Sequence, residues 1–104
     1  MVKHIILWTL KDEFSAEEKE KIKKGIKENL EGLVGQVPGL VSVLVRTECL
    51  PTSTVEVMLD STLETFEALK AYRGHPAHVA VANTFVRPFT ATRACIDYEI
   101  PDEA

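Results

Sequence analysis

The chain is predicted to be an α+β domain whose elements follow the order β-α-β-β-α-β. Two observations carry this prediction: four segments alternate apolar and polar residues as strands do, and the segments between them repeat apolar residues at helical spacing. A length of 104 residues also suits one domain with one hydrophobic core. We expect a single domain over residues 1–104, ordered from residue 2 to residue 100, with a frayed tail at 101–104.

The first predicted strand covers residues 2–10, which are rich in apolar, β-branched and aromatic side chains. Ile6, Trp8 and Leu10 lie on one face of this strand, while Ile5 and Leu7 lie on the other. Because a sheet that faces water needs only one apolar face, the second face of this strand requires a cover.

The first helix is predicted to begin after Ser15, which has the form of a capping box with Glu18. The turn residues Val-Pro-Gly at 37–39 are expected to end it. Its apolar stripe repeats at spacings of four, four and three residues and consists of Ile22, Ile26, Leu30 and Leu33.

The rest of the chain predicts three strands and two helices. Residues 40–47 and 54–60 alternate and should be antiparallel neighbours. Residues 61–64 resemble a second capping box, which predicts a helix from there to a stop at Gly74. Pro76 favours a first helical turn and predicts a short helix to about Asn83. The last strand is expected over residues 90–100.

This order of elements is the ferredoxin-like arrangement, a four-stranded antiparallel sheet with the helices on one face. The helices leave the opposite sheet face uncovered, although the first strand is apolar on both faces. We therefore expect a homodimer in which the open sheet faces of two copies meet.

The composition argues against several classes of protein. A net charge of −4 argues against nucleic acid as the main partner, and the lysines at 19–27 are interleaved with glutamates as on a solvated helix face. We expect no signal peptide and no membrane span. Cys49 and Cys95 match neither a disulfide framework nor paired zinc-ligand spacing, so we expect free thiols in the cytoplasm.

The residues best suited to chemistry gather at the start of the third helix. His75 and His78 stand three apart, and Tyr72 precedes them at the end of the second helix. Imidazoles move protons near neutral pH, and a phenol can donate a hydrogen bond to a developing oxyanion. The competing interpretation is structural, with the histidines bonded to backbone and Tyr72 packed in the core.

A cavity between sheet and helices would extend this cluster. His4 shares a strand face with Trp8 and could line such a cavity, although a lone histidine there is more often a core or rim residue. The same apolar side chains could form the cavity wall or fill a solid core: Trp8, Leu30, Val79, Phe85 and Phe89.

Metal and cofactor sites are weakly indicated. His75 and His78 could share a metal, but Asp60, Glu64 and Asp97 are third ligands by composition only. The sequence has no glycine-rich phosphate loop, no His-Glu-x-x-His motif and no serine nucleophile elbow. We expect neither a metal nor a cofactor.

Four segments resemble the stress-responsive A/B barrel (Dabb) domain family: residues 2–8 (VKHIILW), 11–14 (KDEF), 37–40 (VPGL) and 72–79 (YRGHPAHV). The resemblance spans nearly the whole chain and is most specific at residues 75–78. It implies a dimeric α/β barrel of two ferredoxin-like subunits packed sheet to sheet. Most members have no assigned reaction, but a plant polyketide cyclase of the family closes a ring by aldol-type chemistry without a cofactor. By resemblance, His78 would be the general base, Tyr72 would hold the carbonyl oxygen and His4 would line the pocket.

Three functions are consistent with these observations. The leading one is a homodimer that binds a small apolar carbonyl compound and acts on it by His/Tyr acid–base chemistry. The second is a non-catalytic stress-associated binding protein, and the third is a cofactor-free monooxygenase. An apolar cavity beside His78 favours the first, whereas a filled core with both His75 and His78 bonded to backbone favours the second.

Overall fold

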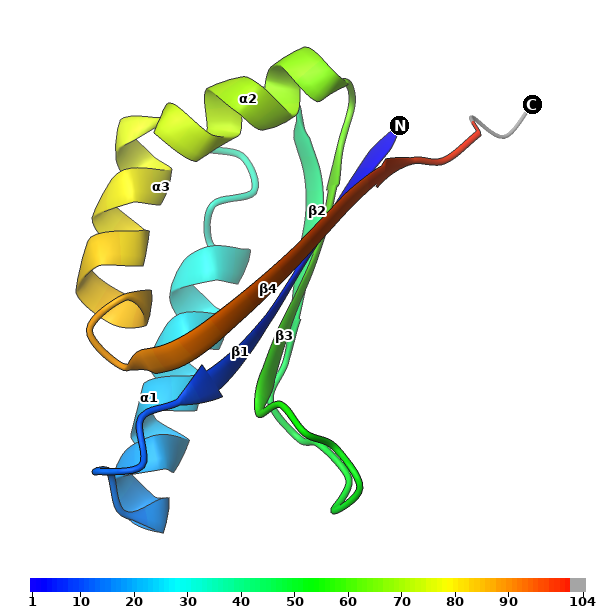
Figure 1. The fold of residues 1–104 in the computed structure, drawn as a ribbon. Helices are drawn as coiled ribbons and strands as arrows, with labels where there is room; N and C mark the ends of the chain where they lie inside the picture. Colours follow the sequence, from blue (N-terminus) through cyan, green and yellow to red (C-terminus); the bar gives the residue numbers. More distant parts are fainter. Residues whose placement is uncertain (102–104) are drawn as a thin grey trace.

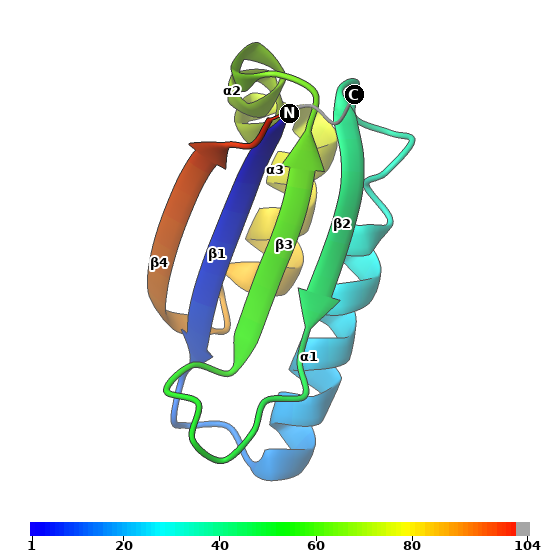
Figure 2. The same cartoon turned by 90° about the vertical axis from the view of Figure 1, so that its right-hand side faces the viewer.

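The computed structural model describes residues 1–101 and has the predicted ferredoxin-like α+β architecture (Figure 1). Four strands, β1 (Val2–Leu10), β2 (Leu40–Arg46), β3 (Val57–Leu63) and β4 (Thr90–Glu99), form one antiparallel sheet in the order β2-β3-β1-β4. Three helices, α1 (Ala16–Glu31), α2 (Phe66–Gly74) and α3 (Pro76–Val81), lie on one side of this sheet. Figure 2 shows the opposite face uncovered.

The central strand β1 has the two apolar faces that its sequence predicts. Its even-numbered side chains, from Val2 to Leu10, are buried under the helices, while Ile5 and Leu7 are half-buried on the open face. Since β1 pairs with both β3 and β4, residues that face each other across these strands share one side of the sheet. This register decides which side chains meet under the helices.

Helix α1 begins as predicted and ends earlier. The Ser15 Oγ accepts from the Glu18 N–H, and the Glu18 carboxylate accepts from the Ser15 N–H, which completes the capping box. The helix stops at Glu31 rather than at the turn 37–39, because Gly32 follows as its C-cap and Gly35 takes a positive φ of 91°. Leu33 remains in the core although it lies beyond the helix.

The boundary between β3 and α2 corrects two predictions. The expected strand 54–60 lies at Val57–Leu63 instead, and Ser61 does not cap a helix. Ser61 is fully buried within β3, where its hydroxyl donates to the backbone carbonyl of His4 at 2.7 Å. The cap of α2 is Thr65, whose Oγ1 accepts from the Ala68 N–H. A serine followed by a glutamate three residues later therefore does not distinguish a cap from a strand end.

Helix α3 is shorter than predicted but the helical path continues. It ends at Val81 and passes without a break into a π-helical turn, η1 (Ala82–Val86), before the chain turns into β4. The core packs between these helices and the sheet, with Ile6, Ile26, Leu63, Leu69 and Tyr72 each no more than 1% exposed. No helix within residues 1–101 is both long and apolar enough to cross a bilayer.

Candidate functional site

A cavity of about 580 Å³ lies between β1 and the α2–α3–η1 segment. Its inner wall is apolar, and its remaining lining carries imidazole and guanidinium groups. Two of the predicted wall residues, Trp8 and Leu30, and two of the histidines, His4 and His78, line it. The other lining residues are Ile6, Leu59, Arg73, Gly74, Ala82, Val86, Arg87, Thr90 and Arg93.

Tyr72 lies between the two cavity histidines. Its ring centroid is 4.3 Å from that of His78 and 6.1 Å from that of His4. The side chain is fully buried, and its hydroxyl has no hydrogen-bond partner among the described residues. Burial raises the pKa of Tyr72 to about 12, so the phenol keeps its proton at neutral pH and can donate it in a hydrogen bond.

His78 is held in one tautomer by the backbone. Its Nδ1 lies 3.2 Å from the carbonyl oxygen of Arg73, and a carbonyl oxygen can only accept, so Nδ1 carries the hydrogen. The other ring nitrogen, Nε2, then has a free lone pair. Burial lowers the pKa of His78, which favours this neutral form at pH 7. His78 therefore has the protonation state of a general base.

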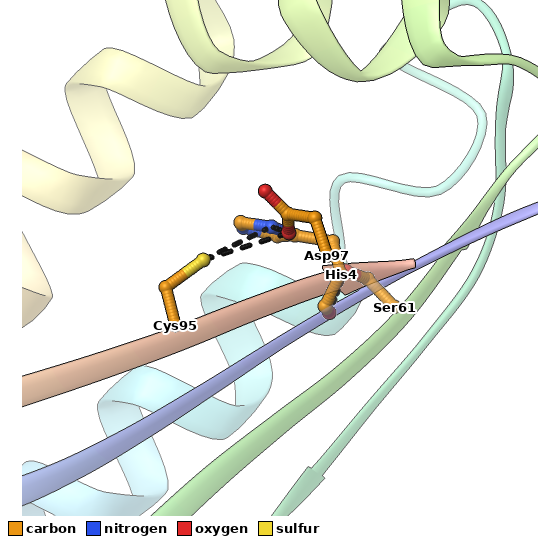
Figure 3. Close-up of polar contacts among 4 residues, drawn as sticks. All are labelled: His4, Ser61, Cys95 and Asp97. Atoms are coloured by element: carbon orange, nitrogen blue, oxygen red, sulfur yellow. Dashed lines mark hydrogen bonds and ion pairs between the residues drawn. The ribbon is translucent and has the colours of Figure 1, made fainter. Parts of the chain in front are cut away.

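His4 forms a pair that was not predicted. It lies opposite Asp97 in the β1–β4 register, and its Nδ1 contacts the Asp97 carboxylate in a short hydrogen bond (Figure 3). His4 is buried, and the Asp97 side chain is 30% exposed at the sheet edge. The carboxylate fixes the orientation of the imidazole. Alternation within each strand does not relate the faces of two strands, so only the β1–β4 register shows that these two residues are neighbours.

Cys95 completes a cluster with this pair. Its Sγ lies 3.5 Å from Asp97 Oδ1 and 3.8 Å from His4 Nδ1. Thiolate, imidazole and carboxylate are zinc ligands, and one potential ligand atom from each residue lies within 4.8 Å of the others. Burial and the nearby Asp97 raise the pKa of the Cys95 thiol, however, so a metal would have to displace a proton there. In the structure the three side chains bond to one another.

Five of the predicted site residues do not line the cavity. Tyr72 lies behind the lining in the hydrophobic core, where its ring is beside that of His78. His75 caps α3, where its Nδ1 accepts from the Ala77 N–H at 3.1 Å. Phe89 packs against Phe14 at a ring-centroid distance of 5.7 Å. Val79 and Phe85 are half-buried outside the cavity lining. Conversely, the three cavity arginines were not predicted, because their positions in the sequence are widely separated.

The sequence of the chain matches a known protein family. Residues 2–100 match the family model described as the Stress Responsive A/B Barrel Domain, Dabb. No curated protein matches the chain.

Several solved structures are similar in fold. A dimeric protein of unknown function with a ferredoxin-like fold from Bacteroides fragilis is 32% identical, with 95% of each chain covered and a TM-score of 0.88. A protein from Arabidopsis thaliana is 27% identical over 100% of this chain and 99% of its own, with a TM-score of 0.75. A hydroxynitrile lyase from Passiflora edulis shares the fold at 18% identity, with 99% and 95% covered and a TM-score of 0.77.

Proposed function

Because the chain belongs to the stress responsive A/B barrel (Dabb) family, we propose that it is a homodimer that binds a small, largely apolar carbonyl compound and catalyses acid–base chemistry on it. The cavity between β1 and the α2–α3–η1 segment is the binding site in this proposal. His78 is the general base, and Tyr72 holds the carbonyl oxygen.

The observation that carries this proposal is the buried, unpartnered hydroxyl of Tyr72 beside the ring of His78. Leaving a buried hydroxyl without a partner costs about 1–3 kcal/mol. Such groups in a native structure call for an explanation, and a catalytic role is one of the recognised ones. A bound carbonyl oxygen would supply the missing acceptor.

The proposed reaction begins with loss of an α-proton. Nε2 of neutral His78 takes the proton, and the electron pair of the broken C–H bond forms an enolate. The Tyr72 hydroxyl, which is itself buried, donates a hydrogen bond to the enolate oxygen. In an aldol-type step, the enolate carbon attacks a second carbonyl carbon. The protonated His78 then returns its proton to the resulting alkoxide.

Dimerisation through the open sheet face is part of the same proposal. The apolar side chains on that face include Ile96, which is 58% exposed, and Leu44, which is 40% exposed. Ile5 lies opposite Ile96 in the β1–β4 register, and Leu44 lies on the same face across Asp60 of β3. An isolated soluble subunit seldom exposes such a patch, and the Bacteroides fragilis protein is dimeric.

One observation favours a non-catalytic binding protein instead. Both His75 and His78 bond to backbone groups, as expected if these histidines serve only the helix start. The cavity beside His78 argues the other way, because a structural role for the histidine does not require an open space next to it. The two functions differ in whether a bound ketone loses a proton.

An exchange experiment tests the proposal. Phenylacetone is incubated with the protein in deuterium oxide, and NMR follows the loss of its α-hydrogen signal. Binding is measured separately from the fluorescence of Trp8, which lines the cavity and is the chain's one tryptophan. We expect saturable exchange by the parent, loss of exchange in His78→Ala, and no effect of Tyr98→Phe, which alters a tyrosine on the open sheet face outside the cavity lining. Equal exchange rates in the parent and in a folded His78→Ala variant would remove the catalytic role.

A further inference from the structure

Three arginines line the cavity, and they come from separate parts of the fold. Arg73 lies in the last turn of α2, Arg87 follows η1, and Arg93 lies on β4. Arg46 is the only other arginine in the sequence, and none of the lysines lines this cavity. The guanidinium groups of the chain are therefore concentrated at one site, where planar donors suit a bidentate contact with an oxyanion.

The positive charge of these arginines is not balanced locally. No Asp or Glu of residues 1–101 lines the cavity, although the whole chain carries a net charge of −4. Arg87 donates from Nη1 to the amide oxygen of Asn83 at 2.5 Å, and that partner is neutral. Arg73 and Arg93 form no ion pair with a carboxylate within this part of the chain. The nearby carboxylate of Asp97 is already bonded to His4.

The arginines and the apolar wall occupy different parts of the cavity. Arg73, Arg87 and Arg93 are exposed, so their charged ends lie toward solvent. Ile6, Leu30 and Leu59 are buried, as is Trp8, and these side chains form the inner wall. A ligand that satisfies both parts has an apolar body and a negatively charged end.

We propose that the substrate of this cavity carries an anionic headgroup, a carboxylate or a phosphate, which the three arginines bind while its apolar carbonyl body lies against the inner wall. This inference rests on the proposed function and names the substrate class of the same site. The arginines select the ligand and orient it, and His78 and Tyr72 act on its carbonyl end.

The headgroup would also affect His78. Burial chiefly lowers the pKa of His78, the hydrogen bond to the Arg73 carbonyl partly opposes this, and the positive charges of His4, Arg87 and Arg73 lower the pKa further. A bound anion would offset the effect of these two arginines and make His78 a stronger base when the substrate is present. Substrate binding and base strength would then be coupled through charge.

Matched ligands test the proposal. The probes are β-benzoylpropionate, an aryl ketone with a carboxylate, and its neutral amide, β-benzoylpropionamide. Binding to the full chain is measured by Trp8 fluorescence. Benzyl phosphate and benzyl alcohol form a second pair that reports whether phosphate is also accepted. We expect the acid to bind about tenfold more tightly than the amide, a difference that decreases as salt is added.

Two variants connect the preference to the arginines. Arg73→Gln combined with Arg93→Gln should abolish the preference for the acid, so that acid and amide bind with equal affinity. Arg46→Gln removes the same charge outside the cavity and should keep the preference. Arg93→Gln alone changes an exposed position on the edge strand and should weaken the preference for the acid. This single variant replaces the double variant in the test if the double variant does not fold.

The outcomes distinguish a failure of the anionic headgroup from a failure of the proposed function. Equal binding of acid and amide by the parent, or a preference that survives in the folded double variant, overturns the anionic headgroup and leaves the proposed ketone chemistry standing. If neither ketone probe binds and phenylacetone exchange is also absent, the proposed function fails and the headgroup with it. A preference for benzyl phosphate over benzyl alcohol that is lost in the double variant supports the anion site and extends it to phosphate.

Discussion

Replacing Tyr72 with phenylalanine should make the protein at least as stable while impairing the proposed acid–base chemistry. The Tyr72 hydroxyl is buried and has no partner among the described residues, so its removal eliminates a desolvated polar group without breaking a hydrogen bond. A buried hydroxyl without a partner costs about 1–3 kcal/mol of stability, which the phenylalanine variant recovers. The van der Waals contacts of the lost oxygen offset part of this recovery. We expect Tyr72→Phe to be more stable than the parent by about 1 kcal/mol near pH 7.

The difference should grow in alkaline solution. Burial raises the pKa of native Tyr72 to about 12 from its ordinary value of 10.0, so above pH 10 the unfolded chain releases this proton while the native protein keeps it. The native protein then binds more protons than the unfolded chain, and the stability of the parent falls as pH rises. By about pH 11 this linkage costs the parent about 1.4 kcal/mol that Tyr72→Phe does not lose.

Urea denaturation near pH 7 and pH 11 measures both effects. Tyr98→Phe is the matched control, because Tyr98 is the only other tyrosine and lies on the open sheet face, opposite Lys3 and away from the cavity, where it is 44% exposed in the isolated subunit. In parallel, phenylacetone exchange should fall about a hundredfold in Tyr72→Phe if the phenol stabilises the enolate. A variant that is clearly less stable than the parent at both pH values would refute the reasoning, since it would mean that the hydroxyl makes a hydrogen bond in solution.

Three further predictions concern a turn, the open face and the base. Gly39→Ala should lose about 3 kcal/mol of stability, because φ is +81° and the added Cβ would lie 2.6 Å from the Ala68 Cβ. Gly35→Ala, at φ +91° with nothing within 4 Å of the added Cβ, should lose only about 1 kcal/mol. Equal losses of stability in thermal denaturation would show that the contact with Ala68 has no effect. Ile96→Glu should shift the protein from dimer to monomer in light scattering, and an unchanged mass would place the interface elsewhere. Burial lowers the pKa of His78 below 6.5, and a general base acts in its neutral form. The exchange rate should therefore rise with pH and reach a plateau, with a midpoint below pH 6.5. A midpoint above pH 6.5 would exclude His78 as the base.

The sequence was sufficient to predict the fold because each element carries its own local signal. The alternation of β1 and the capping box at Ser15 depend on neighbouring residues only, and both are observed. The capping pattern at Ser61 failed because the same residue types fit a strand end, and only burial against His4 distinguishes the two. Local patterns therefore predicted the elements better than their boundaries.

The site was predictable only in part. The short segment containing Tyr72 and His78 could be found from the sequence, because a single helix stop brings its residues together. The pairing of His4 with Asp97 depends on the register of two strands at opposite ends of the chain, which no local pattern specifies. The cavity arginines were missed for the same reason: Arg73 and Arg93 converge only after β4 has joined the sheet.

The joining of β1 to β4 has a consequence for biosynthesis. Their pairing brings together His4 and Asp97, which are 93 residues apart, so the ribosome must release almost the whole sequence before this contact can form. Strand β1 lies between β3 and β4, and until β4 emerges from the ribosome, one edge of β1 stays unpaired. Contacts of such long sequence separation form slowly. A nascent chain that stalls before residue 90 would thus expose an unpaired apolar strand edge and would lack the His4–Asp97 pair, which makes it prone to aggregation and a target for chaperones.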